Sequence, residues 1–217
     1  MIQLVLLEPE IPFNTGAIGR TCVATNTPLH MIKPYGFILN DRNIKRAGMD
    51  YWPKLRLTEY TNYEDFLQQH PEISFEHKEG EAEAAEDNVF GGKAGASPVS
   101  AAAPRLWYAT TKAPQCYSDV HFGPNDFIMM GKESAGIPEN ILRAHPENCI
   151  RIPMWGDMRS LNLSNAAAIV LYEALRQNGF EKLEKMGKLG KARQSLEKGN
   201  CRTADDAVAD MRNKYGL

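Results

Sequence analysis

The chain has 217 residues, and its 25 Lys and Arg against 27 Asp and Glu give a formal net charge of -2. A hydrophobic content of 43% and a charged content of 24% are typical of a soluble globular protein. The four cysteines include no C-x-x-C pair, which argues against a zinc ribbon or a disulfide framework and suits a reducing compartment. No apolar run approaches the ~20 residues of a membrane span. The near-zero charge argues against a protein that binds nucleic acid through bulk electrostatics.

Short apolar runs alternate with helical patterns along the chain. Five such runs predict buried strands, at residues 2–7, 29–32, 106–109, 127–130 and 149–152. Helices are predicted at residues 14–25, 41–47, 61–70 and 163–177. Asn14 or Thr15 is the expected cap of the first helix, and Thr61-x-x-Glu64 is a capping box for the third. This alternation predicts an α/β protein with a mostly parallel sheet flanked by helices.

Two segments depart from this alternation. Residues 76–104 contain six acids and two Lys with few large apolar side chains, so we expect a flexible acidic insertion there. Residues 181–217 carry nine Lys and Arg against six acids. The predicted organisation is therefore one domain over residues 1–179, interrupted at 76–104, with a charged C-terminal extension at 180–217. No basic leader precedes the first strand, so the cytoplasm is the expected location.

Common catalytic and cofactor motifs are absent. The sequence contains no G-x-G-x-x-G, and the phosphate-binding loop pattern fails around Gly131-Lys132 because Asp126 stands where its first glycine is required. The nearby Gly-Lys-Glu-Ser-Ala-Gly run is one residue off the serine-hydrolase elbow. The five histidines lack metal-ligand spacing, and we expect each at the surface or at a helix end, with no bound metal.

Three polar blocks contain more functional groups than helix caps require. In the first, from Glu8 to Arg20, a strand runs through a Pro-rich turn into a helix that begins with Asn, Thr and Gly. A helix N-terminus offers free N–H groups to an anion, so Asn14 and Arg20 are expected to border one cleft. The alternative is that Asn14 only caps the helix and Arg20 pairs with a carboxylate.

The other two blocks also follow predicted strands. One is Gly-Lys-Glu-Ser-Ala-Gly-Ile-Pro at 131–138, and the other runs from Ile150 through Ser160-Leu-Asn-Leu-Ser-Asn165. Open parallel sheets bind ligands beyond the carboxyl ends of their strands, which is where both blocks fall. Taken alone, the first can be an ordinary strand-to-helix turn and the second an elaborate helix cap.

Together these blocks resemble the three signature motifs of the SPOUT superfamily of RNA methyltransferases. Within it the chain is similar to the SpoU branch, which methylates ribose 2′-hydroxyls, and most of all to its TrmL type, which acts on the wobble nucleotide (cytidine or uridine) of tRNA. The stretches that carry the resemblance are LVLLEPEIPFNTGAIGR, LHMIKPYGF, RAGMDYW, GKESAGIP and IRIPMWGDMRSLNLSNAAAIVLYEALRQ. They fall within residues 1–75 and 105–179, so the resemblance leaves out the acidic insertion and the basic tail.

The resemblance implies a fold, a cofactor and an assembly. The fold is an α/β sheet with a deep trefoil knot in its C-terminal part, which generic topology rules would exclude. The cofactor is S-adenosyl-L-methionine, and the assembly is a homodimer that binds tRNA across its interface, with Arg20 reaching toward the partner's cofactor. Helix 163–177 is expected to pack largely into that interface. The implied cofactor pocket consists of Ala109, Thr110, Gly131, Glu133, Ile152, Met154, Ser160 and Leu161.

The resemblance also implies catalytic roles for Arg20, Asn14, Glu133 and Asn162. We expect Arg20 to anchor a phosphate or stabilise charge, since a free guanidinium almost never gives up its proton, and a role as general base is the alternative. Asn14 and Asn162 would orient the ribose hydroxyl, and Glu133 would hold Arg20. Further RNA contacts are expected from three cations on one face of the helix predicted at 41–47, although a solvated face would explain them equally. They are Arg42, Lys45 and Arg46.

Two alternatives to a wobble methyltransferase stay open. A sibling enzyme could act on ribosomal RNA or on another tRNA position, and a non-catalytic RNA-binding factor could retain the fold. Net charge does not separate them, because the acidic insertion alone contributes -4, the rest of the chain is about +2, and the tail is locally basic. What matters for an RNA-binding enzyme is where its basic groups lie.

Overall fold

The computed structural model describes residues 1–39, 51–75 and 103–180. The helix predicted at 41–47, with the RNA contacts expected from Arg42, Lys45 and Arg46, lies outside the described residues. So do nearly all of the acidic insertion and the C-terminal tail. The chain divides into two compact units, Met1–Asn178 and Gly179–Leu217, and the described strands and helices belong to the first.

The described strands form one seven-stranded sheet in the order β3-β2-β1-β6-β4-β7-β5, and every pairing within it is parallel. All five predicted strands are present to within one residue at either end. The two that were not predicted, β3 and β5, lie at the sheet edges. β3 exposes two of its four residues and β5 has only two residues, so neither gives a continuous apolar run. The strands are β1 (Gln3–Leu7), β2 (Leu29–Ile32), β3 (Leu57–Tyr60), β4 (Leu106–Ala109), β5 (Gln115–Cys116), β6 (Phe127–Met130) and β7 (Cys149–Arg151).

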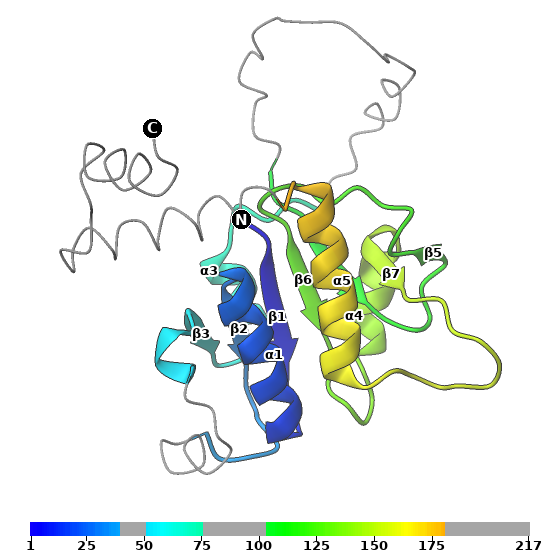
Figure 1. The fold of residues 1–217 in the computed structure, drawn as a ribbon. Coiled ribbons are helices and arrows are strands. Elements are labelled where there is room, and N and C mark those ends of the chain that lie inside the picture. Colours follow the sequence, from blue (N-terminus) through cyan, green and yellow to red (C-terminus); the bar gives the residue numbers. More distant parts are fainter. Residues whose placement is uncertain (40–50, 76–102, 181–217) are drawn as a thin grey trace, which may run out of the picture. The chain divides into compact units, whose positions relative to one another are not determined.

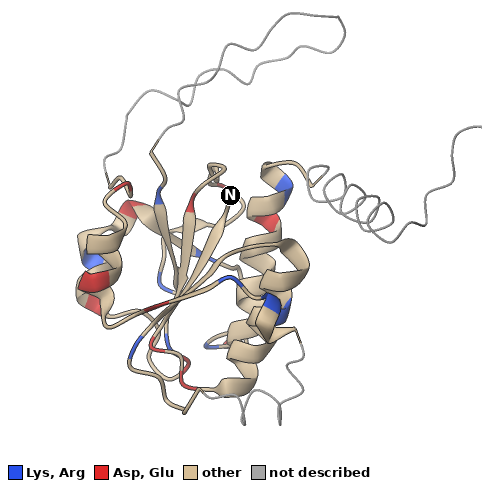
Figure 2. Cartoon of the chain, turned by 90° about the vertical axis from the view of Figure 1, so that its left-hand side faces the viewer, with Lys and Arg blue, Asp and Glu red and all other residues tan. Residues whose placement is uncertain are grey.

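Helices cover both faces of the sheet (Figures 1 and 2). On one face α1 and α5 lie side by side (Figure 1). On the other, α3 and α4 pack on a core that includes Val5, Leu7, Tyr108 and Met129. Because both faces are buried, the central strands are apolar at nearly every position, with exceptions such as Gln3 in β1 and His30 in β2, which is why the sequence predicted them well. The helices are α1 (Pro12–Thr25), α3 (Tyr63–Gln69), α4 (Glu139–Ala144) and α5 (Leu163–Gln177), with short 3₁₀ turns η1 (Trp52–Lys54) and η2 (Pro146–Asn148).

The predicted caps need correction. α1 begins at Pro12, and its N-cap Ile11 has no side-chain capping bond, so neither Asn14 nor Thr15 caps it. Pro12 starts the helix because its fixed φ suits the first helical position. At α3 the capping box is shifted by one residue: Asn62 accepts from the Asp65 N–H at 2.7 Å, and the Asp65 carboxylate accepts from the Thr61 N–H. Among the described residues, no helix is long and apolar enough to cross a membrane.

Candidate active site

A cavity of about 550 Å³ lies beyond the carboxyl ends of β4, β6 and β7. This is the side of a parallel sheet where ligands bind, and the volume falls within the range of small-molecule sites, ~300 to 1,000 Å³. All three polar blocks of the sequence contribute to its wall. The lining residues include Asn14, Ala109, Thr110, Gly131, Lys132, Glu133, Ile152, Met154, Arg159, Ser160, Leu161 and Asn162.

Asn14 joins the three blocks at this cavity. Its Nδ2 donates to Glu133 Oε1 at 2.9 Å, and its Oδ1 accepts from Asn162 Nδ2 at 3.0 Å. A carboxylate can only accept hydrogen bonds, so Glu133 fixes which end of the Asn14 amide faces it. Asn14 is buried, and two side chains from distant parts of the chain hold it in one orientation.

Glu133 accepts hydrogen bonds from the backbone immediately before α1. Its carboxylate accepts from the backbone N–H groups of Glu10 at 2.8 Å and Ile11 at 3.2 Å, in addition to Asn14. These amides lie at the positive end of the helix, where a carboxylate is stabilised. Within one chain Glu133 therefore does not hold its own Arg20, because its oxygens bind the backbone just before α1 and the Asn14 amide.

The loop after β6 is fixed to the loop after β1 by two further carboxylates. Glu10 accepts from the hydroxyl and the backbone N–H of Ser134, both at 2.8 Å, and these bonds lower the pKa of Glu10. Lys132 Nζ lies 2.9 Å from Glu8 Oε2, and Glu8 has a left-handed φ of 50°. A non-glycine residue in that region is uncommon and clusters at functional sites.

Glycine is required at position 131 by close packing of backbone. A Cβ on Gly131 would lie 2.2 Å from the carbonyl carbon of Gly136, far inside van der Waals contact. The same turn is closed by the Gly136 N–H, which donates to the Lys132 carbonyl at 2.8 Å, and Gly136 has a φ of 72°. The two glycines thus form a compact turn that lets backbone groups border the cavity.

The donor set of the cavity fits S-adenosylmethionine. Apolar side chains such as Ile152 and Leu161 offer surface to an adenine ring, while Thr110 and Ser160 offer hydroxyls. All eight residues expected in the cofactor pocket line this cavity. Lys132 and Arg159 were not predicted as site residues from the sequence, although both line the cavity. Each lies in one of the polar blocks, but the prediction rested on other side chains of those blocks.

Arg20 is not among the residues that line this cavity. It lies six residues after Asn14, which places the two side chains about 120° apart around a helix. Asn14 is buried, whereas Arg20 is exposed and its guanidinium lies 5.0 Å from the centre of the Tyr51 ring. The expectation that both residues border one cleft fails within a single chain.

The histidines are less isolated than the sequence indicated. His30 is buried, and its Nδ1 lies 2.7 Å from the Tyr60 hydroxyl, which also lies 2.7 Å from His70 Nε2. The other nitrogen of His30 lies 2.9 Å from Gln3 Oε1. His30 is buried because β2 is covered on both faces, so that all four of its residues are buried, and the expectation of a surface or helix-end position is wrong for this histidine. The described residues contain no group of three or more His, Cys, Asp or Glu side chains that could hold a metal ion.

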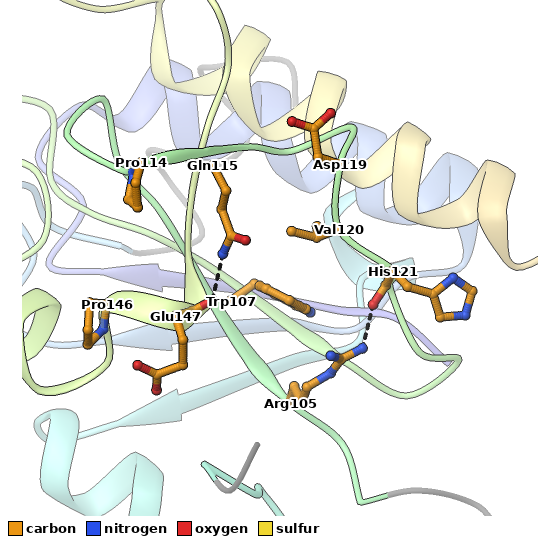
Figure 3. A pocket seen from close by; sticks show the side chains of 9 residues that line it. All are labelled: Arg105, Trp107, Pro114, Gln115, Asp119, Val120, His121, Pro146 and Glu147. Carbon is orange, nitrogen blue, oxygen red and sulfur yellow. Dashed lines mark hydrogen bonds between the residues drawn. The ribbon is translucent and has the colours of Figure 1, made fainter. Parts of the chain in front are cut away.

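A second cavity, of about 430 Å³, lies near the opposite end of β4 (Figure 3). Its principal charged groups already have protein partners. Arg105 lies over the Trp107 ring, 4.7 Å from the ring centre, and its Nε is 3.7 Å from the buried Asp126 carboxylate. Gln115 donates to two backbone carbonyls, those of Glu147 and Cys149. These contacts hold the loops around β5 in place. None of the three polar blocks lines this second cavity, so it is not the site that the blocks form.

Comparisons with known proteins identify a family and several relatives. The SpoU rRNA Methylase family matches residues 1–88 and 99–172. A Yersinia pestis protein named tRNA (cytidine(34)-2′-O)-methyltransferase is 39% identical over 181 residues, which cover 83% of this chain and 96% of that protein. A solved structure concerned with the 2-OH methylation of C/U34 on tRNA is 33% identical, with a TM-score of 0.64, covering 82% of this chain and 95% of the other.

A more distant solved structure supports the fold. It is the SpoU methyltransferase AviRb from Streptomyces viridochromogenes in complex with AdoMet. It is 19% identical, with a TM-score of 0.60, and the match covers 82% of this chain and 57% of that one.

Proposed function

The chain belongs to the SpoU methylase family, and on that premise we propose that it transfers a methyl group from S-adenosylmethionine to the 2′-hydroxyl of a tRNA wobble ribose. The observation that carries the proposal is the meeting of all three motif blocks around one cavity, with Asn14 bonded to both Glu133 and Asn162. The relatives named for cytidine 34 indicate which nucleotide is the acceptor.

Eight residues of the cavity would hold the cofactor, which supplies a methyl group made electrophilic by its positively charged sulfur. Ala109 and Thr110 would border it from the end of β4, and Gly131 and Glu133 from the turn after β6. The wall is completed by Ile152, Met154, Ser160 and Leu161.

The ribose hydroxyl is a weak nucleophile, so its orientation matters. Asn14 keeps a second N–H on Nδ2 and a second lone pair on Oδ1 after bonding to Glu133 and Asn162. These can donate to and accept from the hydroxyl, and Glu133 and Asn162 act as positioning residues through Asn14. Positioning of this kind can contribute several kcal/mol to lowering the barrier, out of a maximum of roughly 7–11 kcal/mol.

Arg20 acts across a homodimer interface in this proposal. The exposed residues of α1 recur at positions 13, 17, 20 and 24, and those of α5 at 165, 169, 172 and 176, so each helix presents one stripe to solvent. Phe13 is 76% exposed, Ile169 37% and Tyr172 47%. Because α1 and α5 lie side by side, the stripes form one partly apolar face that a second copy can cover (Figure 1).

Such a dimer gives the Arg20 guanidinium a role that it lacks in one chain. Placed in the middle of the α1 stripe, it would reach the partner's cavity and anchor the phosphate beside the acceptor ribose. Arg42, Lys45 and Arg46 would extend phosphate binding along the RNA.

The trefoil knot and the domain organisation are also part of the proposal. The strand order supports the knot, since β7 lies between β4 and β5, which both precede it in the chain. A strand inserted between two earlier strands can carry the following segment beneath their connection. In this organisation the methyltransferase domain spans residues 1–179, with residues 76–104 as an insertion and 180–217 as an extension.

The test is methylation of an unmodified tRNA transcript by the purified protein, with the 2′-O-methyl mapped to single nucleotides. We expect one new methyl, on the wobble ribose. A transcript with a single 2′-deoxy wobble nucleotide is the matched control and should accept none. Mapping total tRNA and ribosomal RNA from cells with and without the protein distinguishes the alternatives, because loss of a ribosomal methyl would reassign the substrate.

A further inference from the structure

The loop that joins β7 to α5 carries an exposed aromatic side chain next to the cofactor cavity. Trp155 is 96% exposed, and Met158, three residues on, is 66% exposed. The loop residues on either side of these two, Met154 and Arg159, line the cavity. A large apolar surface held at the mouth of a cavity indicates a binding contact.

The backbone of the loop directs this pair of side chains outward. Gly156 has a φ of 70°, and a Cβ built on it would meet no atom within 4 Å, so the turn here is open to solvent. The loop extends well away from the ribbon of the sheet before it returns to α5 (Figure 1). Met154 and Ser160 face the cavity, while Trp155 projects from it.

We propose that Trp155 stacks on a base of the RNA loop next to the nucleotide whose ribose is methylated. This inference rests on the proposed function, which places a single-stranded RNA loop at this cavity. Bases in such loops are splayed out of their stack and are recognised by stacking on aromatic side chains. Trp155 offers its indole within one residue of the cavity wall, so a base stacked there lies close to the acceptor ribose.

Arg159 is exposed and lines the same cavity four residues after Trp155, so its guanidinium can contact a phosphate of the bound RNA. The acid of the loop, Asp157, does not line the cavity. A second copy of the chain is the other surface that could cover Trp155. The exposed α1 and α5 stripes, on separate elements, already supply a face for a second copy, and the cavity mouth is where the substrate must enter.

The experiment compares Trp155→Ala with Trp155→Phe on the full chain, using the anticodon stem-loop of the substrate tRNA. Loss of one stacked base should raise the KM for RNA about tenfold in Trp155→Ala, and Phe should restore most of it. The affinity for S-adenosylmethionine, measured by calorimetry, should stay at the wild-type value in both variants. An unchanged KM for RNA in Trp155→Ala would overturn the proposal.

Abasic substitutions identify the base. Each loop nucleotide is replaced in turn, and the stacked position is the one whose loss weakens binding to wild type but no longer weakens binding to Trp155→Ala. If every abasic position weakens both proteins equally, Trp155 stacks on no base.

Sedimentation of the variants tests whether a second copy of the chain covers Trp155. Dissociation of a dimer in Trp155→Ala, with RNA binding per dimer unchanged, would assign the indole to the interface. Failure of the wild-type protein to methylate any stem-loop would instead refute the proposed function itself.

Discussion

The side chains of Asn162 and Asn14 meet at 3.0 Å, although they are 148 positions apart in the chain. Asn162 uses its two ends differently. Its Oδ1 accepts from the backbone N–H groups of Ser164 and Asn165 and so caps α5, while its Nδ2 donates to Asn14. One residue therefore serves both helix stability and the orientation of the active-site amide.

These two roles can be separated by substitution. Asn162→Asp keeps an oxygen for the cap but loses the donor to Asn14, so we expect nearly wild-type stability with methyl transfer lowered at least tenfold. Asn162→Ala loses both and should also cost about 1 kcal/mol of unfolding free energy, as removed caps do. Urea unfolding and single-turnover methylation measure the two effects.

Asn62 provides the matched control, because it caps α3 in the same way and lies outside the cavity. Asn62→Ala should lose about as much stability as Asn162→Ala, again ~1 kcal/mol, and methylate at the wild-type rate. Equal activity in Asn162→Asp and wild type would show that the Asn14 contact has no catalytic role.

Arg20 should act in trans. Arg20→Ala is expected to bind S-adenosylmethionine normally and to lose most methyl transfer, and Asn14→Ala should also be nearly inactive. If each site combines Asn14 of one protomer with Arg20 of the other, a mixed dimer of the two variants contains one intact site. Random mixing should then restore about a quarter of wild-type activity.

The outcome is measured after the two variants are unfolded and refolded together, with each variant refolded alone as the control. No recovery in the mixture, with mixed dimers demonstrated by differently tagged chains, would place Arg20 in the same site as its own Asn14. Wild-type activity in Arg20→Ala alone would remove Arg20 from the mechanism altogether.

How far the sequence predicted this structure depended on the kind of interaction. Strands buried on both faces were predicted within a residue, since burial makes nearly every position apolar. The cap of α1 was not, because the group that binds the backbone at its start is Glu133, more than 100 residues away, and no local pattern encodes that contact. The expected cleft between Asn14 and Arg20 of one chain failed for a local reason, because six helical residues place the two side chains about 120° apart. The family resemblance supplied the cofactor residues that periodicity could not.

The two glycines of the turn after β6 should differ in their response to alanine. Gly131→Ala places a Cβ 2.2 Å from backbone that cannot move without opening the turn, so cofactor binding should be lost. In Gly136→Ala the added Cβ meets no atom within 4 Å, so the only expected cost is the backbone strain of an alanine at a φ of 72°. That strain costs roughly 1–2 kcal/mol, so the second variant should keep measurable cofactor affinity. Calorimetric titration compares them, and equal loss in both would mean that conformation, not space, governs the turn.

Buried His30 should make stability fall in mild acid. Burial, with the nearby His70 adding to it, lowers the pKa of His30 from 6.5 to about 4. The unfolded chain therefore binds a proton between these values that the folded chain excludes. Above pH 6.5 the protonation of His30 does not affect stability. As pH falls toward 4, the free energy of unfolding declines by up to about 3 kcal/mol, because only the unfolded chain takes up the proton.

The measurement is the free energy of unfolding in urea between pH 7.5 and 5. His30→Gln should be less stable at pH 7.5, because its contacts to Tyr60 and Gln3 change, but its dependence on pH over this range should be flatter than in wild type. The exposed His121→Gln is the control and should keep the wild-type slope. Identical slopes for all three proteins would assign the acid sensitivity to other groups.

Removing residues 76–102 should leave the fold intact. The described ends of this segment are already joined, since the Ser74 N–H donates to the Pro104 carbonyl at 2.9 Å, so a short Gly/Ser linker can close the gap. The deletion takes away six acids and two Lys. With less negative charge on the chain, affinity for RNA should stay the same or rise, most clearly at low salt. Circular dichroism with urea unfolding tests the fold, and tRNA binding over a series of salt concentrations tests the affinity.

A variant that keeps the length of residues 76–102 but has their acids changed to Gln separates the effect of charge from that of length. Loss of cooperative unfolding in the deletion, but not in the Gln variant, would make the segment structural.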